Sequence, residues 1–87
     1  MLAVSTVTES HRETREKVAR NLVQQRKRAG ISTRRLARES GVDERLLRRY
    51  EAATHQPSTT NLLRISAVIG QSLEWFYGNH DDGARDG

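Results

Sequence analysis

The sequence predicts an all-α fold, a compact domain of five short helices. Its 87 residues suit one small domain. Apolar residues recur at helical spacing, and runs of β-branched residues are almost absent. Ser, Asp and Gly stand at the intervals at which short helices begin and end. Because only 34% of the residues are hydrophobic, the core is expected to be thin, so that oligomerisation would help.

The ends of the chain carry little helical pattern. Residues 1–8 have no helical period and the next turns are polar all round, so residues 1–14 are expected to form a flexible N-terminal arm. A short strand that pairs with a partner chain is the alternative for this arm. The last residues, 79–87, have the composition of a disordered tail. The folded domain is therefore expected over residues 15–78.

The first two helices are predicted from apolar spacing and capping residues. The first is expected over about 15–29 and ends at Gly30. Its apolar positions are Val18, Leu22, Val23 and Ala29. Ser32 is a natural N-cap for the second helix, which turns Leu36 inward and stops at Gly41.

The third helix carries a cluster of charge on its outer face. Asp43 caps it, and it is expected over about 44–51. Its buried stripe comprises Leu46, Leu47 and Tyr50. The residues left on the outer surface are Glu44, Arg45, Arg48 and Arg49.

Two further helices follow a loop. Pro57 disfavours helix just before it, and Ser58 caps a fourth helix that Gly70 ends. The apolar face of this helix is expected to comprise Leu62, Leu63, Ile65, Ser66 and Ile69. Ser72 caps a short fifth helix over 73–77, rich in aromatic residues.

The charge is unevenly distributed along the chain. Residues 12–49 hold thirteen Lys and Arg against five Asp and Glu, whereas residues 50–87 hold two against five. Such asymmetry points to a polyanionic partner, with a merely solvated Arg-rich surface as the alternative. The chain has no cysteine, which fits a reducing compartment, and it shows neither a membrane-spanning run nor a signal peptide. A cytoplasmic protein that contacts no membrane is expected.

Three residues at fixed offsets predict a helix-turn-helix formed by the second and third helices. Two helices that cross over a three-residue turn need a small residue at the crossing and Gly where the backbone turns back. Ala37, Gly41 and Leu47 have this spacing. A plain helical hairpin is the alternative. In a DNA-reading pair, the first residues of the third helix would meet base edges in the major groove.

The outward residue types suit DNA. Arg can donate two parallel hydrogen bonds to guanine, and Glu can accept one from cytosine. Thr33 and Arg34 open the second helix, where backbone N–H groups, a hydroxyl and a guanidinium could hold one phosphate. Arg35 and Arg38 are expected to be solvated only.

The chain from about Val18 to Tyr77 resembles the Cro/CI-type, or XRE, family of helix-turn-helix domains. The residues that carry the resemblance are Arg26, Gly30, Ser32, Leu36, Ala37, Gly41, Val42, Leu47, Tyr50, Glu51, Pro57, Leu62, Leu63, Ile65, Ile69, Gly70, Ser72, Leu73, Trp75 and Phe76. The resemblance implies a five-helix, lambda-repressor-like domain whose third helix reads double-stranded DNA. It also implies a homodimer on a palindromic operator.

The resemblance assigns roles to individual positions. The base-reading positions match Glu44, Arg45 and Arg49. The resemblance matches Thr33 to a phosphate-clamping position, and the full set of phosphate candidates is Ser32, Thr33, Arg34, Asp43 and Arg48, with free solvent as the alternative for Arg48. The positions of an internal ion pair match Arg26 and Glu51. The candidates for a dimer seam on the C-terminal aromatic helix are Trp75 and Tyr77.

Several positions depart from the family pattern. Thr33 replaces a frequent Gln, so its side chain is shorter. Ala52 and Ala53 replace a polar residue and a Gly, and the loop that follows has no Lys or Arg. The alternative function is therefore a protein-interaction module that uses the aromatic helix or the first helix.

No motif of an enzyme or a cofactor site is recognisable. The sequence lacks a Gly-rich phosphate loop, a Cys nucleophile and a supported Ser/His/Asp set. The histidines, His11, His55 and His80, are far apart in polar stretches, so no metal site is expected. The expected function is a DNA-binding transcriptional regulator, with repression as its mode and without a small-molecule ligand.

Overall fold

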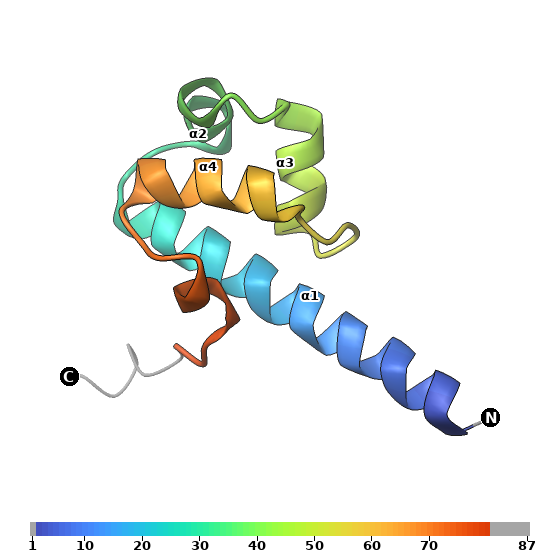
Figure 1. Cartoon of the computed structure of the whole chain (residues 1–87). Helices are drawn as coiled ribbons and strands as arrows, with labels where there is room; N and C mark the ends of the chain where they lie inside the picture. Colours follow the sequence, from blue (N-terminus) through green and yellow to red (C-terminus); the bar gives the residue numbers. More distant parts are fainter. Residues whose placement is uncertain (1, 81–87) are drawn as a thin grey trace.

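The computed structural model describes residues 2–80 and shows four α-helices followed by one 3₁₀ helix (Figure 1). In chain order the elements are α1 (Leu2–Arg28), α2 (Thr33–Ser40), α3 (Glu44–Glu51), α4 (Thr59–Ile69) and the 3₁₀ helix η1 (Glu74–Tyr77). The described residues therefore form an all-helical fold, which confirms the predicted class. None of these helices is long and apolar enough to cross a bilayer.

The first helix begins much earlier than predicted. α1 starts at Leu2 instead of residue 15, so the expected flexible arm over residues 1–14 is helical from its second residue on. No Gly or Pro interrupts residues 2–28, and a helix without an apolar stripe stays compatible with solvent. Apolar periodicity was the signal used to place this helix, and it begins only at Val18. The first turns of α1 project past the other helices in Figure 1.

α2, α3 and α4 begin where the capping residues predicted, and α2 and α4 end at the predicted glycines. Ser32, Asp43 and Ser58 each accept a hydrogen bond, at 3.0–3.1 Å, from the backbone N–H three residues later. Gly41 and Gly70 follow α2 and α4 with φ of 79° and 74°. A residue with a Cβ disfavours this left-handed backbone conformation, whereas Gly adopts it readily. Each helix therefore ends directly before its Gly.

One apolar core joins the helices. α2 packs against α3 and α4, while α1 packs against α3 and η1. The buried core residues are Val18, Leu22, Leu36, Ala37, Val42, Leu47, Tyr50, Leu62, Ile65, Ile69 and Phe76. The prediction that Leu63 belongs to the apolar face is wrong, since Leu63 is 49% exposed. One residue step turns a helix by about 100°, and Leu62 occupies the inward position.

The fifth element is a 3₁₀ helix instead of the predicted α-helix. The backbone N–H groups of Trp75, Phe76 and Gly78 each donate to the carbonyl three residues earlier, at 3.1–3.2 Å. The segment between Ile69 and Gly78 is short, and 3₁₀ turns are common in such short pieces. Residues 2–80 thus contain four α-helices, and η1 seals the core through Phe76, which is fully buried.

A buried amide that the sequence analysis did not single out holds η1 in place. The Nδ2 group of Asn21 on α1 donates to the carbonyls of Phe76 and Gly78 at 2.8 and 2.9 Å. Asn21 is 2% exposed, so these bonds replace the water it would otherwise hold.

The predicted disordered tail, residues 79–87, begins with ordered contacts. The ring of His80 stacks on Trp75 with centroids 4.3 Å apart, and its Nε2–H donates to the Trp75 carbonyl at 2.6 Å. The prediction is therefore wrong for His80, because an aromatic ring within reach offers it a partner. Residues 81–87 of the predicted tail lie outside the described residues.

Candidate DNA interface

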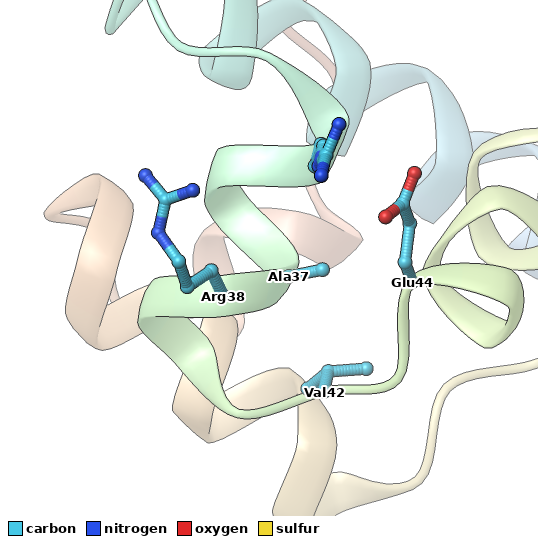
Figure 2. Close-up of a pocket in the computed structure, with 5 residues that line it drawn as sticks. Ala37, Arg38, Val42 and Glu44 are labelled. Carbon is cyan, nitrogen blue, oxygen red and sulfur yellow. The ribbon is translucent and has the colours of Figure 1, made fainter.

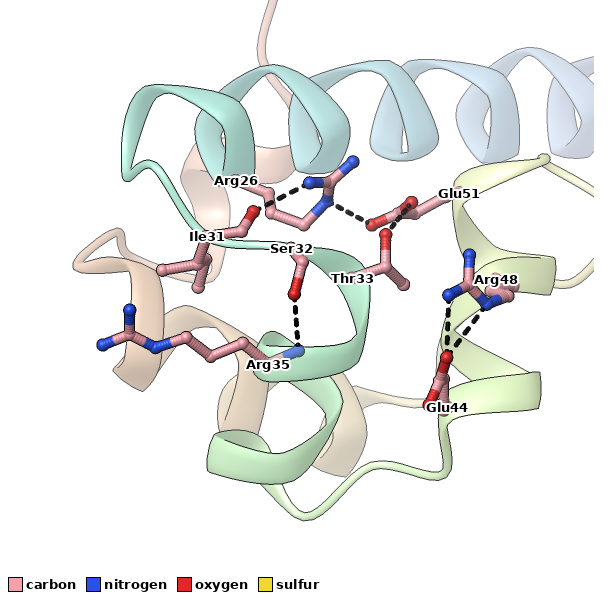
Figure 3. A network of polar contacts seen from close by, with 8 residues as sticks. All are labelled: Arg26, Ile31, Ser32, Thr33, Arg35, Glu44, Arg48 and Glu51. Carbon is pink, nitrogen blue, oxygen red and sulfur yellow. Dashed lines mark hydrogen bonds and ion pairs between the residues drawn. The ribbon is translucent and has the colours of Figure 1, made fainter.

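An ion pair ties the end of α3 to α1, as the sequence predicted (Figure 3). Nε of Arg26 donates to Oε2 of Glu51 at 2.8 Å, and each side chain is 13% exposed. Nη1 of Arg26 also donates to the carbonyl of Ile31 at 2.8 Å. Removing one partner of such a buried pair costs about 3–5 kcal/mol, because the remaining charge is left without compensation.

The side chain of Thr33 belongs to this network. Its side chain is 7% exposed, and its hydroxyl donates to Oε1 of Glu51 at 2.9 Å. The prediction that this hydroxyl holds a phosphate is corrected, because the side chain points to Glu51 and its hydroxyl is used there (Figure 3). The backbone N–H groups of Thr33 and Arg34 lie in the first helical turn, where N–H groups lack partners within the helix. The start of α2 keeps the capacity to bind an anion.

Two of the other phosphate candidates cap helices. Oγ of Ser32 accepts from the backbone N–H of Arg35 at 3.0 Å, but its own O–H can still donate to a phosphate. Oδ2 of Asp43 accepts from the backbone N–H of Leu46 at 3.0 Å. A carboxylate has no hydrogen to donate and repels a phosphate, so the side chain of Asp43 is unsuited to the role the sequence analysis assigned to it.

The crossing of α2 and α3 is built from small and buried residues. Ala37 is 6% exposed and Leu47 is fully buried, while Gly41 makes the turn between the helices. The helix-turn-helix predicted from this spacing is therefore present. Because Leu47 and Tyr50 face the core, the opposite face of α3 lies outward.

A shallow pocket opens between the outer sides of the two helices (Figure 2). The residues that line it are Arg34, Ala37, Arg38, Val42 and Glu44. Figure 2 shows Ala37 and Val42 along its floor, with Glu44 rising from α3. Arg38 lines this pocket as well, whereas the sequence analysis expected it to be solvated only. Arg35 lies apart from the pocket and pairs with Glu39 on the exposed side of α2, at 2.7 Å.

The outer face of α3 carries one ion pair and two further arginines that do not take part in that pair. Nη2 and Nε of Arg48 donate to Oε2 of Glu44 at 2.7 and 3.2 Å (Figure 3). Within the part of the chain that the structure describes, Arg45 and Arg49 take part in no ion pair, and both are exposed. The three base-reading candidates, Glu44, Arg45 and Arg49, thus share one face of α3. The guanidinium groups of Arg45 and Arg49 are accessible.

The two candidates for a dimer seam differ in accessibility. Tyr77 is 41% exposed. Trp75 is partly buried, because it meets Phe76 edge to face at 5.3 Å and stacks on His80. Tyr77 therefore offers the larger free surface for a partner.

Comparison with known proteins identifies the family. A family model described as helix-turn-helix matches residues 22–76, which is more than half of the chain. The matched segment begins within α1, contains the crossing of α2 and α3, and ends in η1. No curated protein and no solved structure gives a significant match. The chain belongs to the Cro/CI-type helix-turn-helix family, a family of DNA-binding regulators.

Proposed function

We propose that the chain is a sequence-specific transcriptional regulator that reads the major groove of double-stranded DNA with α3. The observation that carries the proposal is the pair Arg45 and Arg49, both exposed and outside any ion pair among the described residues. Each guanidinium can donate two hydrogen bonds to O6 and N7 of guanine, a contact that discriminates by about 1–3 kcal/mol.

The ion pair next to these arginines is weak enough to exchange on DNA. Arg48 and Glu44 are spaced i, i+4, and their side chains are 59% and 40% exposed. Such a pair contributes about 0.3–0.5 kcal/mol. On DNA, Glu44 would accept from N4 of cytosine and Arg48 would turn to a phosphate. The stronger contact with the base edge favours this exchange.

The start of α2 would set the register of α3 on the duplex. The hydroxyl of Ser32 and the backbone N–H groups of Thr33 and Arg34 belong to the first turn of α2, and the side chain of Arg34 is exposed. Such groups hold a phosphate without reading sequence. Specificity is therefore assigned to α3 and positioning to α2.

A homodimer on a palindromic operator would complete the recognition unit. One α3 of eight residues reaches only a few base pairs, and two copies would read half-sites about one helical turn apart. The exposed Tyr77 supports a seam at the C-terminal end of the fold. Repression is the proposed mode, because it requires only that the dimer occupy its operator, and the cytoplasm is the proposed location.

Selection of bound fragments from random duplex DNA tests this function. The expected result is an enriched palindrome whose half-site spacing gives the distance between the two α3 helices. Retention of random fragments should weaken steeply as salt rises, because bound phosphates release counterions. No retention at low salt would overturn DNA binding and favour the protein-interaction module.

A further inference from the structure

The loop between α3 and α4 is held by a residue from outside the segment that matches the family. Nε of Arg15 on α1 donates to the carbonyl of Ala53 at 2.7 Å. Arg15 precedes the matched segment, residues 22–76. Ala53 has φ of 64°. α1 thus places a guanidinium against the loop.

A pocket lies where α1 meets this loop. It measures about 290 Å³ and is lined by Gln56 of the loop and by His11, Thr14 and Arg15 of α1. A phosphate group is much smaller than this volume. The polar groups on its wall include hydrogen-bond donors from a guanidinium and an amide.

The position of the loop relative to α3 brings it to a DNA backbone. An α-helix of eight residues is about 12 Å long, and the major groove is about 12 Å wide. If the first residues of α3 meet base edges, its last residues and the loop that follows reach the wall of the groove, which is lined by phosphates. The loop, residues 52–58, has no Lys or Arg of its own.

Arg15 can supply the charge that the loop lacks. A guanidinium has five N–H donors, and the Nε–H is the one that Ala53 accepts. Among the described residues Arg15 takes part in no ion pair. Arg12 lies three residues earlier, on the same side of α1, and is exposed. Its charge adds to that of Arg15 at the same flank.

We infer that Arg15, anchored on the α3–α4 loop and supported by Arg12, contacts a phosphate beside the major groove. The inference rests on the proposed DNA-reading function. Through Arg15, α1 would be a second element that contacts the DNA backbone, on the side of α3 away from the start of α2. Since phosphate contacts are independent of base sequence, the contact should strengthen binding to any duplex.

The salt dependence of binding tests the inference with a duplex of random sequence. Fluorescence anisotropy would give the association constant of the full chain and of Arg15→Gln over a range of salt concentrations. The slope of log K against log salt should decrease in magnitude by about 0.9 in the variant, which is the loss of one phosphate contact. Arg15→Lys keeps the charge and should keep a slope near that of the unchanged chain.

Control variants separate the inference from a merely structural role. Arg20 is exposed on another face of α1, and Arg20→Gln should leave the slope unchanged. If Arg15 only anchors the loop, Arg15→Gln and Arg15→Lys will weaken binding equally at the original slope, and the inference is overturned. If the unchanged chain binds no duplex at low salt, both the proposed function and this inference are overturned. Binding that depends on Arg45 but not on Arg15 would overturn the inference alone.

Discussion

Glu51 connects three helices through its two carboxylate oxygens. It is the last residue of α3, and it accepts from Arg26 of α1 and from Thr33 of α2. Both oxygens are therefore satisfied within the protein, and the end of α3 is tied to α1 and α2. A helix that must present Arg45 and Arg49 to a rigid duplex benefits from such fixed supports.

Thr33→Val tests whether Thr33 supports α3 or binds phosphate. The variant keeps the shape of the side chain but leaves Oε1 of Glu51 without its donor, so unfolding should become easier by about 1–3 kcal/mol. Urea denaturation measures this change. The salt dependence of DNA binding should stay as it was, and a decrease in its slope would restore the phosphate role.

Arg45→Ala tests the assignment of base reading to α3. Loss of one bidentate contact should weaken binding to the selected site by about 1–3 kcal/mol relative to random DNA. Competition between the two duplexes measures the ratio. Arg35→Ala is the matched control, because Arg35 pairs with Glu39 on the exposed side of α2. Equal losses on both duplexes would remove Arg45 from the base-reading role.

At the scale of elements, α2 and α3 depend on packing for their stability. Each has eight residues, and isolated helices of this length are marginal in water. Their side-chain caps and the buried residues Leu36 and Leu47 stabilise them in the fold. The geometry of the crossing therefore depends on the same core that α1 and α4 complete.

Ala53→Gly tests the strain in the α3–α4 loop. Ala53 has φ of 64°, where a Cβ costs about 1–2 kcal/mol. Gly also makes the unfolded chain more flexible, which offsets about 0.4–1 kcal/mol of the strain energy removed. The free energy of unfolding of the variant should therefore rise by roughly 0.5–1 kcal/mol. Thermal unfolding measures the change.

Ala52→Gly is the control for the loop. Ala52 has φ of −85°, an ordinary helical value, so this variant should lose stability by about 0.5–1 kcal/mol. Stabilisation by both substitutions would show that the sign of φ is not the cause.

At the scale of the whole molecule, most of the positive charge belongs to the first three helices, whereas the exposed aromatic residue Tyr77 belongs to the last element. The basic residues of α1, α2 and α3 fall within residues 12–49, which hold thirteen of the fifteen Lys and Arg. Tyr77, with 41% of its surface exposed, lies on η1. The proposed DNA contact and the proposed dimer seam therefore use different elements of the fold.

Tyr77→Asp tests the proposed dimer seam. A charge placed in a desolvated seam should weaken binding to the full palindrome but leave binding to a single half-site unchanged, because α3 is untouched. Gel-shift titration on both duplexes measures the difference. Leu63→Asp is a matched control on exposed α4 surface. Equal affinity of Tyr77→Asp and the unchanged chain for the palindrome would exclude Tyr77 from the seam.

The elements that sequence reasoning placed correctly are those specified by local signals. Ser32 and Asp43 cap helices through residues three positions away, and a cap needs no distant partner. The N-terminal half of α1 was missed because its apolar residues do not form a stripe. The last helix was predicted as a short helix without its 3₁₀ type, and its contact with the buried Asn21 was missed because the two lie far apart in the sequence.

The sequence by itself determined where α2, α3 and α4 begin, the crossing of α2 and α3 and the outward face that carries Arg45 and Arg49. These features follow from spacing within about one or two helical turns. Only the tertiary structure decided that Thr33 serves Glu51, at a separation of 18 residues, and that Arg15 meets Ala53, at a separation of 38. The partner of a polar side chain across such distances depends on how the helices pack, and no local pattern encodes it.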